Sequence, residues 1–296
     1  ACPWATLLLA RGKPKERQGV DKLSPNGGFL SDAPSSPILL FDSGVGGLTV
    51  YDALRKVLPQ APVIYAADLA GLPYGTKTEA QIAARVAGLL GRMAERWQPR
   101  LACIACNTAS TIALGMVRDV LEIPVVGTVP AIKPASALTQ TGTIGLVGTE
   151  ATIRQRYVDD LEAQFAAGKR LLRVAAPGLV QAAEAKLRGR VVDPALIIDV
   201  RDRLAALAGA DRIDTLVLAC THFPLLAEEL AAAFGPQVAQ VDGAAGIARR
   251  IAHLLEGQDF APGSAPNRFV VTGPLAGADG LEAALAARGF GAPEAF

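Results

Sequence analysis

The sequence predicts an α/β fold in which helices cover both faces of parallel sheets, and three observations support this prediction. Short apolar runs rich in Val, Ile and Leu alternate with longer amphipathic runs along most of the 296 residues, and such alternation is typical of strand–helix–strand units. Glycine or small polar residues follow several of the apolar runs. The order of elements starts again near the middle of the chain, which indicates an internal duplication.

The first set of elements is expected to begin near Pro37. Apolar runs of a few residues predict strands at 38–41, 63–67, 101–105 and 125–127. Apolar residues spaced three or four apart predict helices at 48–58, 79–97 and 109–121, the first of which ends at Pro59. A loop at 71–76 follows the second strand, and ligands of such sheets bind at the carboxyl ends of the strands.

The second set repeats this alternation. Its predicted strands are residues 143–147, 171–175 and 215–219. Its predicted helices are residues 153–166, 181–187, 194–208 and 224–234. A strand at 238–242 is expected to return to the first set, followed by a helix at 244–255, a loop at 258–267, a strand at 268–272 and a helix at 281–288.

These elements predict three regions of the chain. We expect a flexible extension at 1–36, a first α/β domain formed by 37–129 plus 241–296, and a second α/β domain at 130–240. The turn that begins at Asp42 recurs at Gly148, and the strand that ends at Cys106 recurs at Cys220. The two spacings are similar, as a duplication would require.

Composition excludes several classes of protein. The 29 basic and 28 acidic residues give a net charge of +1, and without a basic run among aromatics there is no electrostatic argument for nucleic acid binding. The apolar runs are interrupted well before the roughly 20 residues of a membrane span. Four cysteines in a chain of this length do not suggest a disulfide framework and favour a cytoplasmic location. The apolar start lacks the basic segment of a signal peptide, and because the chain does not begin with Met, its true start is open.

Cys106 and Cys220 each end an apolar run and precede small polar residues and a helical pattern. A cysteine so placed lies at the carboxyl end of a strand and beside a helix N-terminus, where backbone N–H groups and the helix dipole favour the thiolate. A buried structural thiol would not need the polar residues that follow. Two such cysteines in two similar units predict two thiols that face one pocket from opposite sides, as racemisation requires.

The glycine-rich turn at 42–47 follows the first predicted strand. A nicotinamide-binding turn would have a glycine three residues after Gly46, but Thr49 stands there. We therefore favour a turn that binds a small anion through its backbone N–H groups, and a purely structural turn stays open. Asp42 ends the strand at the carboxyl edge of the sheet and is expected to meet the ligand.

Cys103 and Cys106 have the spacing of a redox pair. Residues three apart on a strand point to opposite faces, so we expect Cys103 to lie in the core. A metal site is likewise disfavoured. A zinc site that used Cys103 and Cys106 would need two more ligands, and the plausible ones that remain are only Cys2, Cys220, His222 and His253. His253 lies within a helical pattern and is expected at the surface.

Four segments resemble the signature blocks of glutamate racemases, within the wider aspartate/glutamate racemase superfamily. The segments are 41–50 (FDSGVGGLTV), 73–75 (PYG), 105–109 (ACNTA) and 218–224 (LACTHFP). The resemblance spans about 37–252 and follows the order of the family. The chain departs from it at Ala176, where members often have a cysteine. It also departs near Gly71, where an arginine common in many members is replaced, and we expect this to alter contacts at the loop.

The resemblance implies two flavodoxin-like parallel-sheet domains that face each other across an interdomain active site, with no cofactor and no metal. It implies that Cys106 exchanges the α-proton on the D-glutamate face, assisted by Asp42. It implies that Cys220 does so on the L-glutamate face, assisted by Glu184 and His222. The substrate-binding residues would be Asp42, Ser43, Pro73, Tyr74, Gly75, Cys106, Asn107, Thr108, Thr149, Thr152, Cys220, Thr221 and His222. It further implies a cytoplasmic homodimer that supplies D-glutamate for peptidoglycan synthesis and has neither a nucleic acid nor a membrane as a partner.

The chemistry sets its own demands on these residues. The α-hydrogen of an amino acid is a very weak acid, so the pocket needs donors aimed at the developing negative charge, which Asn107, Thr108, Thr221 and turn amides could supply. A helix N-terminus and a neighbouring partner are expected to lower a thiol pKa toward neutrality, with thiolate on one side and thiol on the other. Three alternatives stay open: an aspartate racemase or one-cysteine decarboxylase of the superfamily, a binding module without catalysis, and a redox protein.

Overall fold

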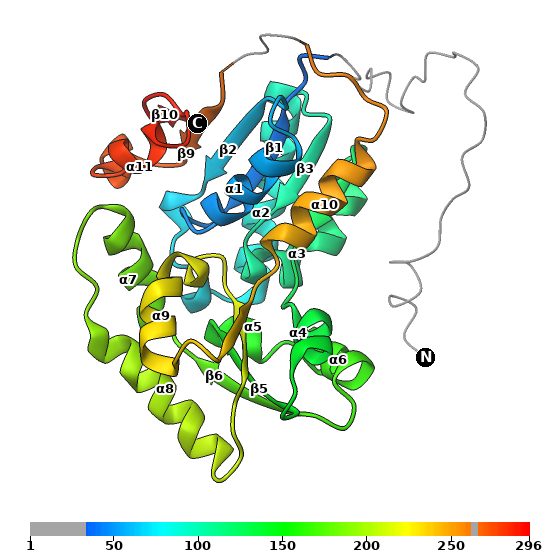
Figure 1. Cartoon of the computed structure of the whole chain (residues 1–296). Helices are drawn as coiled ribbons and strands as arrows, with labels where there is room; N and C mark the ends of the chain where they lie inside the picture. Colours follow the sequence, from blue (N-terminus) through cyan, green and yellow to red (C-terminus); the bar gives the residue numbers. More distant parts are fainter. Residues whose placement is uncertain (1–33, 262–265) are drawn as a thin grey trace. The chain divides into compact units, whose positions relative to one another are not determined.

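Two parallel sheets organise the chain (Figure 1). The first sheet has six strands in the order β10–β9–β2–β1–β3–β4, and the second has four in the order β6–β5–β7–β8. The computed structural model describes residues 34–261 and 266–296, and these residues belong to one compact unit. The extension predicted at 1–36 lies outside the described residues except for its last three positions. The predicted α/β class with parallel sheets is confirmed.

The first sheet is covered by helices on both faces. Its strands are β1 (Ile38–Asp42), β2 (Val63–Ala67), β3 (Leu101–Ile104), β4 (Val125–Gly127), β9 (Arg268–Val271) and β10 (Glu294–Ala295). Its helices are α1 (Leu48–Val57), α2 (Glu79–Trp97), α3 (Asn107–Val120), α10 (Ala244–Leu254) and α11 (Glu282–Ala286), with 3₁₀ turns η1 (Leu69–Gly71), η2 (Tyr74–Thr76) and η4 (Leu275–Ala278). Along β1, Ile38 and Leu40 pack beneath α1 and α10, whereas Leu39 and Phe41 pack beneath α2 and α3, because successive side chains of a strand point to opposite faces.

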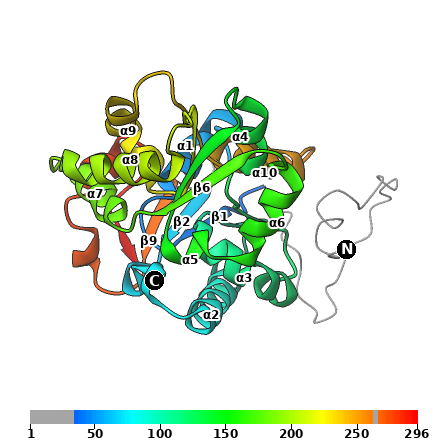
Figure 2. The ribbon, with the colours of Figure 1, turned by 90° about the horizontal axis from the view of Figure 1, so that it is seen from below.

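The second sheet has the same layered build (Figure 2). Its strands are β5 (Thr143–Gly148), β6 (Arg170–Ala175), β7 (Thr215–Ala219) and β8 (Ala239–Val241). Its helices are α4 (Ile132–Leu138), α5 (Glu150–Ile153), α6 (Arg156–Phe165), α7 (Gly178–Leu187), α8 (Pro194–Ala208) and α9 (Ala227–Phe234), with the 3₁₀ turn η3 (Phe223–Leu226). One core cluster joins α7, α8 and η3 to the sheet, and the other joins α4 and α6 to its opposite face. Whether the two sheets are separate domains with the predicted boundaries stays a prediction.

The strand expected at 238–242 does form, but its expected return to the first sheet is wrong. β8 pairs in parallel with β7, with Ala239 opposite Thr215. Gly235 ends α9 at a positive φ of 91°, a conformation that glycine adopts without strain. The chain then turns back along its own sheet, and the Ala239 N–H donates to the Asp214 carbonyl. The return is made by α10, which packs against α1.

Three further differences concern helices. The predicted helix at 153–166 is two helices, α5 and α6, because Gln155 between them has an extended backbone with φ −67° and ψ 131°. Thr149 caps the start of α5 by accepting a hydrogen bond from the Thr152 N–H. The predicted helix at 224–234 begins as the 3₁₀ turn η3 before α9. The short helix α4 was not predicted, because its seven residues include a proline and give little periodicity.

The packing of α1 on the first sheet can be tested by its stability contribution. Leu54 has no exposed surface, whereas Val57 on the same helix is 42% exposed. Replacing Leu54 by Ala should lower the free energy of unfolding by about 2–5 kcal/mol, because it leaves a cavity in the core. Val57→Ala should change it by about 0.5 kcal/mol or less. Urea unfolding measures both, and equal effects would contradict the described packing.

Candidate active site

The polar residues of the candidate site lie where strands of both sheets end. Asp42 is the last residue of β1, and Cys106 lies two residues after the end of β3. Cys220 follows β7 in the second sheet. All three are buried, with Cys106 and Cys220 only 6% and 7% exposed. The two cysteines thus hold equivalent positions at the carboxyl ends of internal strands, where α/β sheets bind their ligands.

Cys106 caps the first turn of α3. Its Sγ accepts a hydrogen bond from the Ala109 N–H at 3.4 Å and lies 3.3 Å from the Ser43 hydroxyl. The helix therefore begins two residues earlier than the sequence predicted, because the cysteine itself serves as the cap. Small neighbours let the sulfur lie against the helix end.

The electrostatics of Cys106 differ from the expectation. Burial raises the pKa of the Cys106 thiol to about 12, and the Asp42 carboxyl adds to the increase. The Ser43 hydroxyl and the Ala109 N–H act in the opposite direction but do not outweigh burial. The expected lowering of the thiol pKa toward neutrality is wrong for this cysteine, because the loss of water destabilises the thiolate by more than the helix N-terminus stabilises it. Cys106 is therefore a neutral thiol at physiological pH.

Cys220 faces a buried histidine. The Cys220 Sγ lies 3.8 Å from His222 Nδ1, and His222 Nε2 lies 3.1 Å from Glu184 Oε1. Burial acts to lower the pKa of His222, but the hydrogen bonds with Cys220 and Glu184 raise it to about 10. His222 is therefore an imidazolium at neutral pH, and this cation can stabilise negative charge on the neighbouring sulfur.

Asp42 connects the two halves. Its carboxylate accepts hydrogen bonds from the N–H groups of Ser43 at 2.9 Å and Gly47 at 2.5 Å. The hydroxyls of Tyr65 and Thr221 also donate to it, at 3.3 and 3.4 Å. Thr221 belongs to the second-sheet side of the site, so one carboxylate joins groups from both sheets. Burial raises the pKa of Asp42, although His222 and the two N–H groups lower it in part.

Three threonines form a compact hydroxyl cluster beside Cys106. The Thr108 Oγ1 lies 3.0 Å from Thr149 Oγ1 and 3.1 Å from Thr152 Oγ1, and the latter two lie 3.0 Å apart. The cluster joins the N-terminus of α3 to α5. Next to it, the Oδ1 atom of Asn107 is buried and has no hydrogen-bond partner among the described residues. A buried acceptor of this kind is expected to meet a donor, such as an ammonium group of a ligand.

The loop at 73–75 is held by a residue that the sequence analysis did not include. The Tyr74 hydroxyl donates to Asp68 Oδ2 at 2.6 Å, and Asp68 also accepts from Arg85 and Thr272. A Cβ at Gly71 would lie 2.2 Å from Asp68 Oδ2, so glycine leaves room for this ion pair at the position where the sequence departs from the family pattern. Asp68 could have been found from its place after β2, which matches that of Asp42 after β1.

The predicted site residues gather in two groups. The first group is Asp42, Ser43, Cys106, Asn107, Thr108, Thr149 and Thr152, and the second is Glu184, Cys220, Thr221 and His222. A Cβ at Gly75 would lie 3.7 Å from Thr149, so the loop borders the first group. Pro73 and Glu184 line one pocket of about 320 Å³. Sequence reasoning missed Tyr65, Asp68, Arg85 and Arg188, whose polar contacts depend on tertiary structure.

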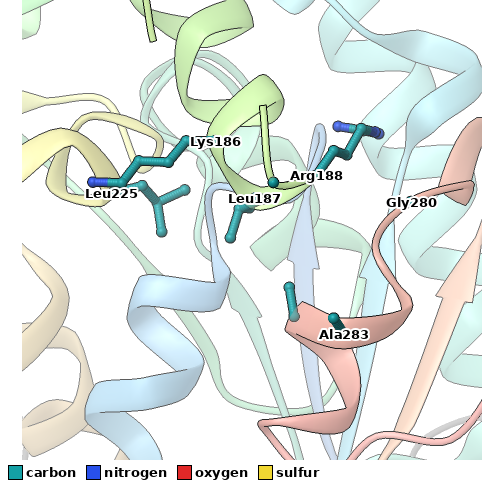
Figure 3. A pocket seen from close by; sticks show the side chains of 8 residues that line it. Lys186, Leu187, Arg188, Leu225, Gly280 and Ala283 are labelled. Atoms are coloured by element: carbon teal, nitrogen blue, oxygen red, sulfur yellow. The ribbon is translucent and has the colours of Figure 1, made fainter. Parts of the chain in front are cut away.

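A larger pocket of about 510 Å³ lies beyond Glu184 and contains neither cysteine (Figure 3). It is lined by Lys186, Leu187, Arg188, Gly189, Leu225, Gly280, Ala283 and Ala284. Its lining is largely apolar and brings no acid/base pair together. The larger pocket therefore does not coincide with the candidate active site at the strand ends.

The alternatives for other residues are resolved in part. Cys103 has no exposed surface and packs on the face of β3 opposite to Cys106, so its prediction as a core residue is confirmed. Cys103, Cys106 and Cys220 are all free thiols. The side chain of His253 is 68% exposed, as expected. Within 34–261 and 266–296, no group of three or more His, Cys, Asp and Glu residues could hold a metal ion, and no helix there has the length and apolar character to cross a bilayer.

The relatives of this chain and the solved structures that share its fold of two parallel sheets are racemases, a class of isomerase. The chain belongs to the Asp/Glu/Hydantoin racemase family, whose model matches residues 48–251. The predicted family membership is confirmed.

Individual relatives agree with this assignment. The glutamate racemase of Sphingopyxis alaskensis is 60% identical over 240 residues, which cover 81% of this chain and 90% of that protein. The glutamate racemase of Pectobacterium carotovorum is 44% identical over 256 residues, covering 86% and 88%. The crystal structure of Escherichia coli glutamate racemase in complex with L-glutamate and the activator UDP-MurNAc-Ala has a TM-score of 0.79 at 41% identity, covering 88% of this chain and 98% of that one.

The close approach of the turn after β1 to His222, on the second-sheet side of the site, can be tested at Gly46. A Cβ at this position would lie 2.5 Å from His222 Nδ1 and 2.6 Å from the His222 backbone N, distances that real side chains do not tolerate. Gly46→Ala should therefore displace His222 and lower racemase activity on the order of 10²-fold. The control is Gly88→Ala on α2, where an added Cβ meets nothing within 4 Å. Full activity of Gly46→Ala would contradict the contact.

Proposed function

We propose that this protein interconverts L-glutamate and D-glutamate without a cofactor, using Cys106 and Cys220 as the two acid/base groups. We further propose that it works in the cytoplasm and supplies D-glutamate for peptidoglycan synthesis. Support comes from the family, from curated relatives that carry the name glutamate racemase, and from the similar structure described with L-glutamate. A homodimer stays a prediction.

The observation that carries this proposal is the short path of contacts between the two sulfurs. Ser43 contacts Cys106 and also donates to Asp42, which in turn accepts from Thr221, the neighbour of Cys220. The charge of Cys220 also contributes to the raised pKa of Cys106, as expected for two groups that share one site. Two thiols so close can flank the α-carbon of one small substrate.

The resting proton positions suit the conversion of the L-enantiomer. Cys106 holds a proton, because burial raises its pKa to about 12. The Cys220 sulfur accepts the α-proton from the face that it contacts, and Cys106 delivers its own proton to the opposite face. The C–H bond on one face breaks as the C–H bond on the other forms. Afterwards Cys220 is protonated and Cys106 is not, which is the arrangement that the D-enantiomer needs.

The remaining polar groups bind and orient the amino acid. Asn107 Oδ1, which is buried without a partner among the described residues, is suited to accept from the substrate ammonium group. The hydroxyls of Thr108 and Thr221 and the turn amides at 44–46, which Asp42 does not engage, are suited to bind carboxylate oxygens and to stabilise charge that develops on them. Asp42 assists Cys106 through Ser43 rather than by direct contact, since both link to Ser43. His222 assists Cys220 directly.

The two cysteines can be tested separately. Cys106→Ala and Cys220→Ala should each lower racemisation of glutamate in both directions by about 10²- to 10⁴-fold or more, because each removes one acid/base group. Cys103→Ala is the matched control, since Cys103 is equally buried but faces the core. Circular dichroism of the isolated enantiomers over time measures the rate. A Cys106→Ala enzyme with full activity would rule out the mechanism.

The same assay distinguishes the alternative functions. Turnover of aspartate with no turnover of glutamate would identify a sibling racemase of the family. Saturable binding of glutamate without conversion by the unmodified protein would identify a binding module.

The pH dependence follows from His222. Because its pKa is about 10, the imidazolium is present below that pH and is lost as the pH rises through about 10. The kcat/KM for racemisation should therefore fall on the alkaline side near this value. In His222→Asn this alkaline limb should change position or disappear. An unchanged limb in the variant would contradict the assignment of His222 as the cation beside Cys220.

A further inference from the structure

Arg188 contacts Glu184, the predicted catalytic residue that is linked to Cys220 through His222. It follows the last residue of α7, four residues after Glu184, and its Nη1 forms an ion pair with Glu184 Oε2. The other carboxylate oxygen, Oε1, contacts His222 Nε2. Glu184 thus has a different cation on each oxygen, and only one of the two, Arg188, carries a permanent charge.

The same guanidinium is fixed from the other side by the first sheet's part of the chain. Its Nε donates to the Asp279 carbonyl at 3.2 Å, and its Nη2 donates to the Gly277 carbonyl at 3.1 Å. Both carbonyls lie in or just after η4, which follows β9. Figure 3 shows Arg188 and Gly280 on the two segments that meet at the larger pocket. Arg188 therefore ties the end of α7 to the segment at 277–280.

We propose that Arg188 is a positioning residue for the Cys220 half of the site: anchored on the carbonyls of Gly277 and Asp279, it holds the Glu184 carboxylate against His222. This inference rests on the proposed function. The contacts form one series, from the η4 carbonyls through Arg188, Glu184 and His222 to the Cys220 sulfur. Arg188 acts through Glu184 and touches neither sulfur.

The surroundings of Glu184 explain why it needs this partner. Its side chain is only 12% exposed, and a buried carboxylate is costly unless cations or donors satisfy both oxygens. Burial raises the pKa of Glu184, but the contacts with His222 and Arg188 outweigh burial and lower it.

The other charged and titratable groups near Glu184 do not replace Arg188. Asp42 from β1 and Tyr65 from β2 add no positive charge. Arg190 lines the same pocket as Glu184, but among the described residues the ion pairs of Glu184 are those with Arg188 and His222. Lys186 is engaged by Glu229 at 2.8 Å. Without Arg188, the carboxylate would keep His222 as its one cationic contact and would be free to rotate.

The test measures coupling between Arg188 and Glu184 in racemisation. Arg188→Met keeps the apolar stem of the side chain and removes the guanidinium with its charge, so it should lower kcat/KM about 10-fold, a coupling typical of residues in contact. It should also move the acid limb of the pH–rate profile upward by about one pH unit, because Glu184 loses a stabilising cation. In a Glu184→Gln background the same change should alter kcat/KM by less than about twofold.

Arg188→Lys separates charge from geometry. Lysine can reach Glu184 but cannot also donate to both η4 carbonyls, so its activity and acid limb should lie between those of the unmodified enzyme and Arg188→Met. If Arg188→Met fails to fold, as judged by thermal unfolding, this variant decides the question. An unmodified rate and pH profile in Arg188→Lys would then overturn the proposal.

The matched control is Arg203→Met. Arg203 forms an i,i+4 ion pair with Asp199 on α8 in the same relative order, but both side chains are exposed. It should leave the rate and the pH profile unchanged.

Two results would overturn the positioning role. One is an Arg188→Met enzyme with the unmodified pH profile, and the other is an equal loss in the presence and absence of the Glu184 carboxylate. As an internal check, kcat/KM must be equal for L- and D-glutamate in every variant, because enantiomers have equal free energies. If the unmodified protein does not racemise glutamate, it is the proposed function that fails, and this is established before any variant is compared.

Discussion

The site depends on a balance of buried charge where the two sheets end. The His222 imidazolium lies between Glu184 and the Cys220 sulfur. It also lies near enough to Asp42 to offset in part the rise that burial causes in the pKa of that carboxyl. An unpaired charge in such a place would be neutralised or would unfold its surroundings. Each charged group therefore stabilises the charge of its neighbours, and this stabilisation requires residues from both sheets to lie together.

The backbone makes this closeness achievable. Glycine at position 46 lets the turn after β1 approach the His222 backbone so closely that no space is left for a Cβ. The same turn supplies N–H groups to Asp42. Parallel strands place all their carboxyl ends at one edge of a sheet, so residues far apart in sequence meet there. The fold thus supplies position, and the small residues supply room.

Much of this was predictable from local patterns. The spacing of apolar residues predicted both α2 and α8 with their observed bounds. The structure adds the local reasons for their starts, a Thr78–Gln81 capping box for α2 and Pro194 for α8. The positions of Cys106 and Cys220 after apolar strands predicted their place in the fold. The pairing of β8 with β7 was not predictable, because the sequence pattern of a three-residue strand contains no information on which strand it pairs with.

The electrostatics of the site were less accessible to sequence reasoning. A helix N-terminus beside Cys106 suggested a lowered pKa, but the raised value results from desolvation, which depends on every atom packed around the sulfur. Arg188 carries no motif, and its importance appears only when the η4 segment is seen to accept its remaining N–H groups. The local sequence therefore indicates the candidate acid/base groups, whereas tertiary packing determines their protonation.

The central claim, that two thiols flank one carbon, is tested most directly by following the α-hydrogen itself. L-glutamate that carries deuterium at the α-carbon is racemised in ordinary water and both enantiomers are analysed by mass spectrometry at low conversion. Two thiols on opposite faces predict that the D-glutamate formed contains only solvent hydrogen, while the recovered L-glutamate keeps its deuterium. Deuterium in the D-glutamate product would show that one group served both faces and would contradict the account.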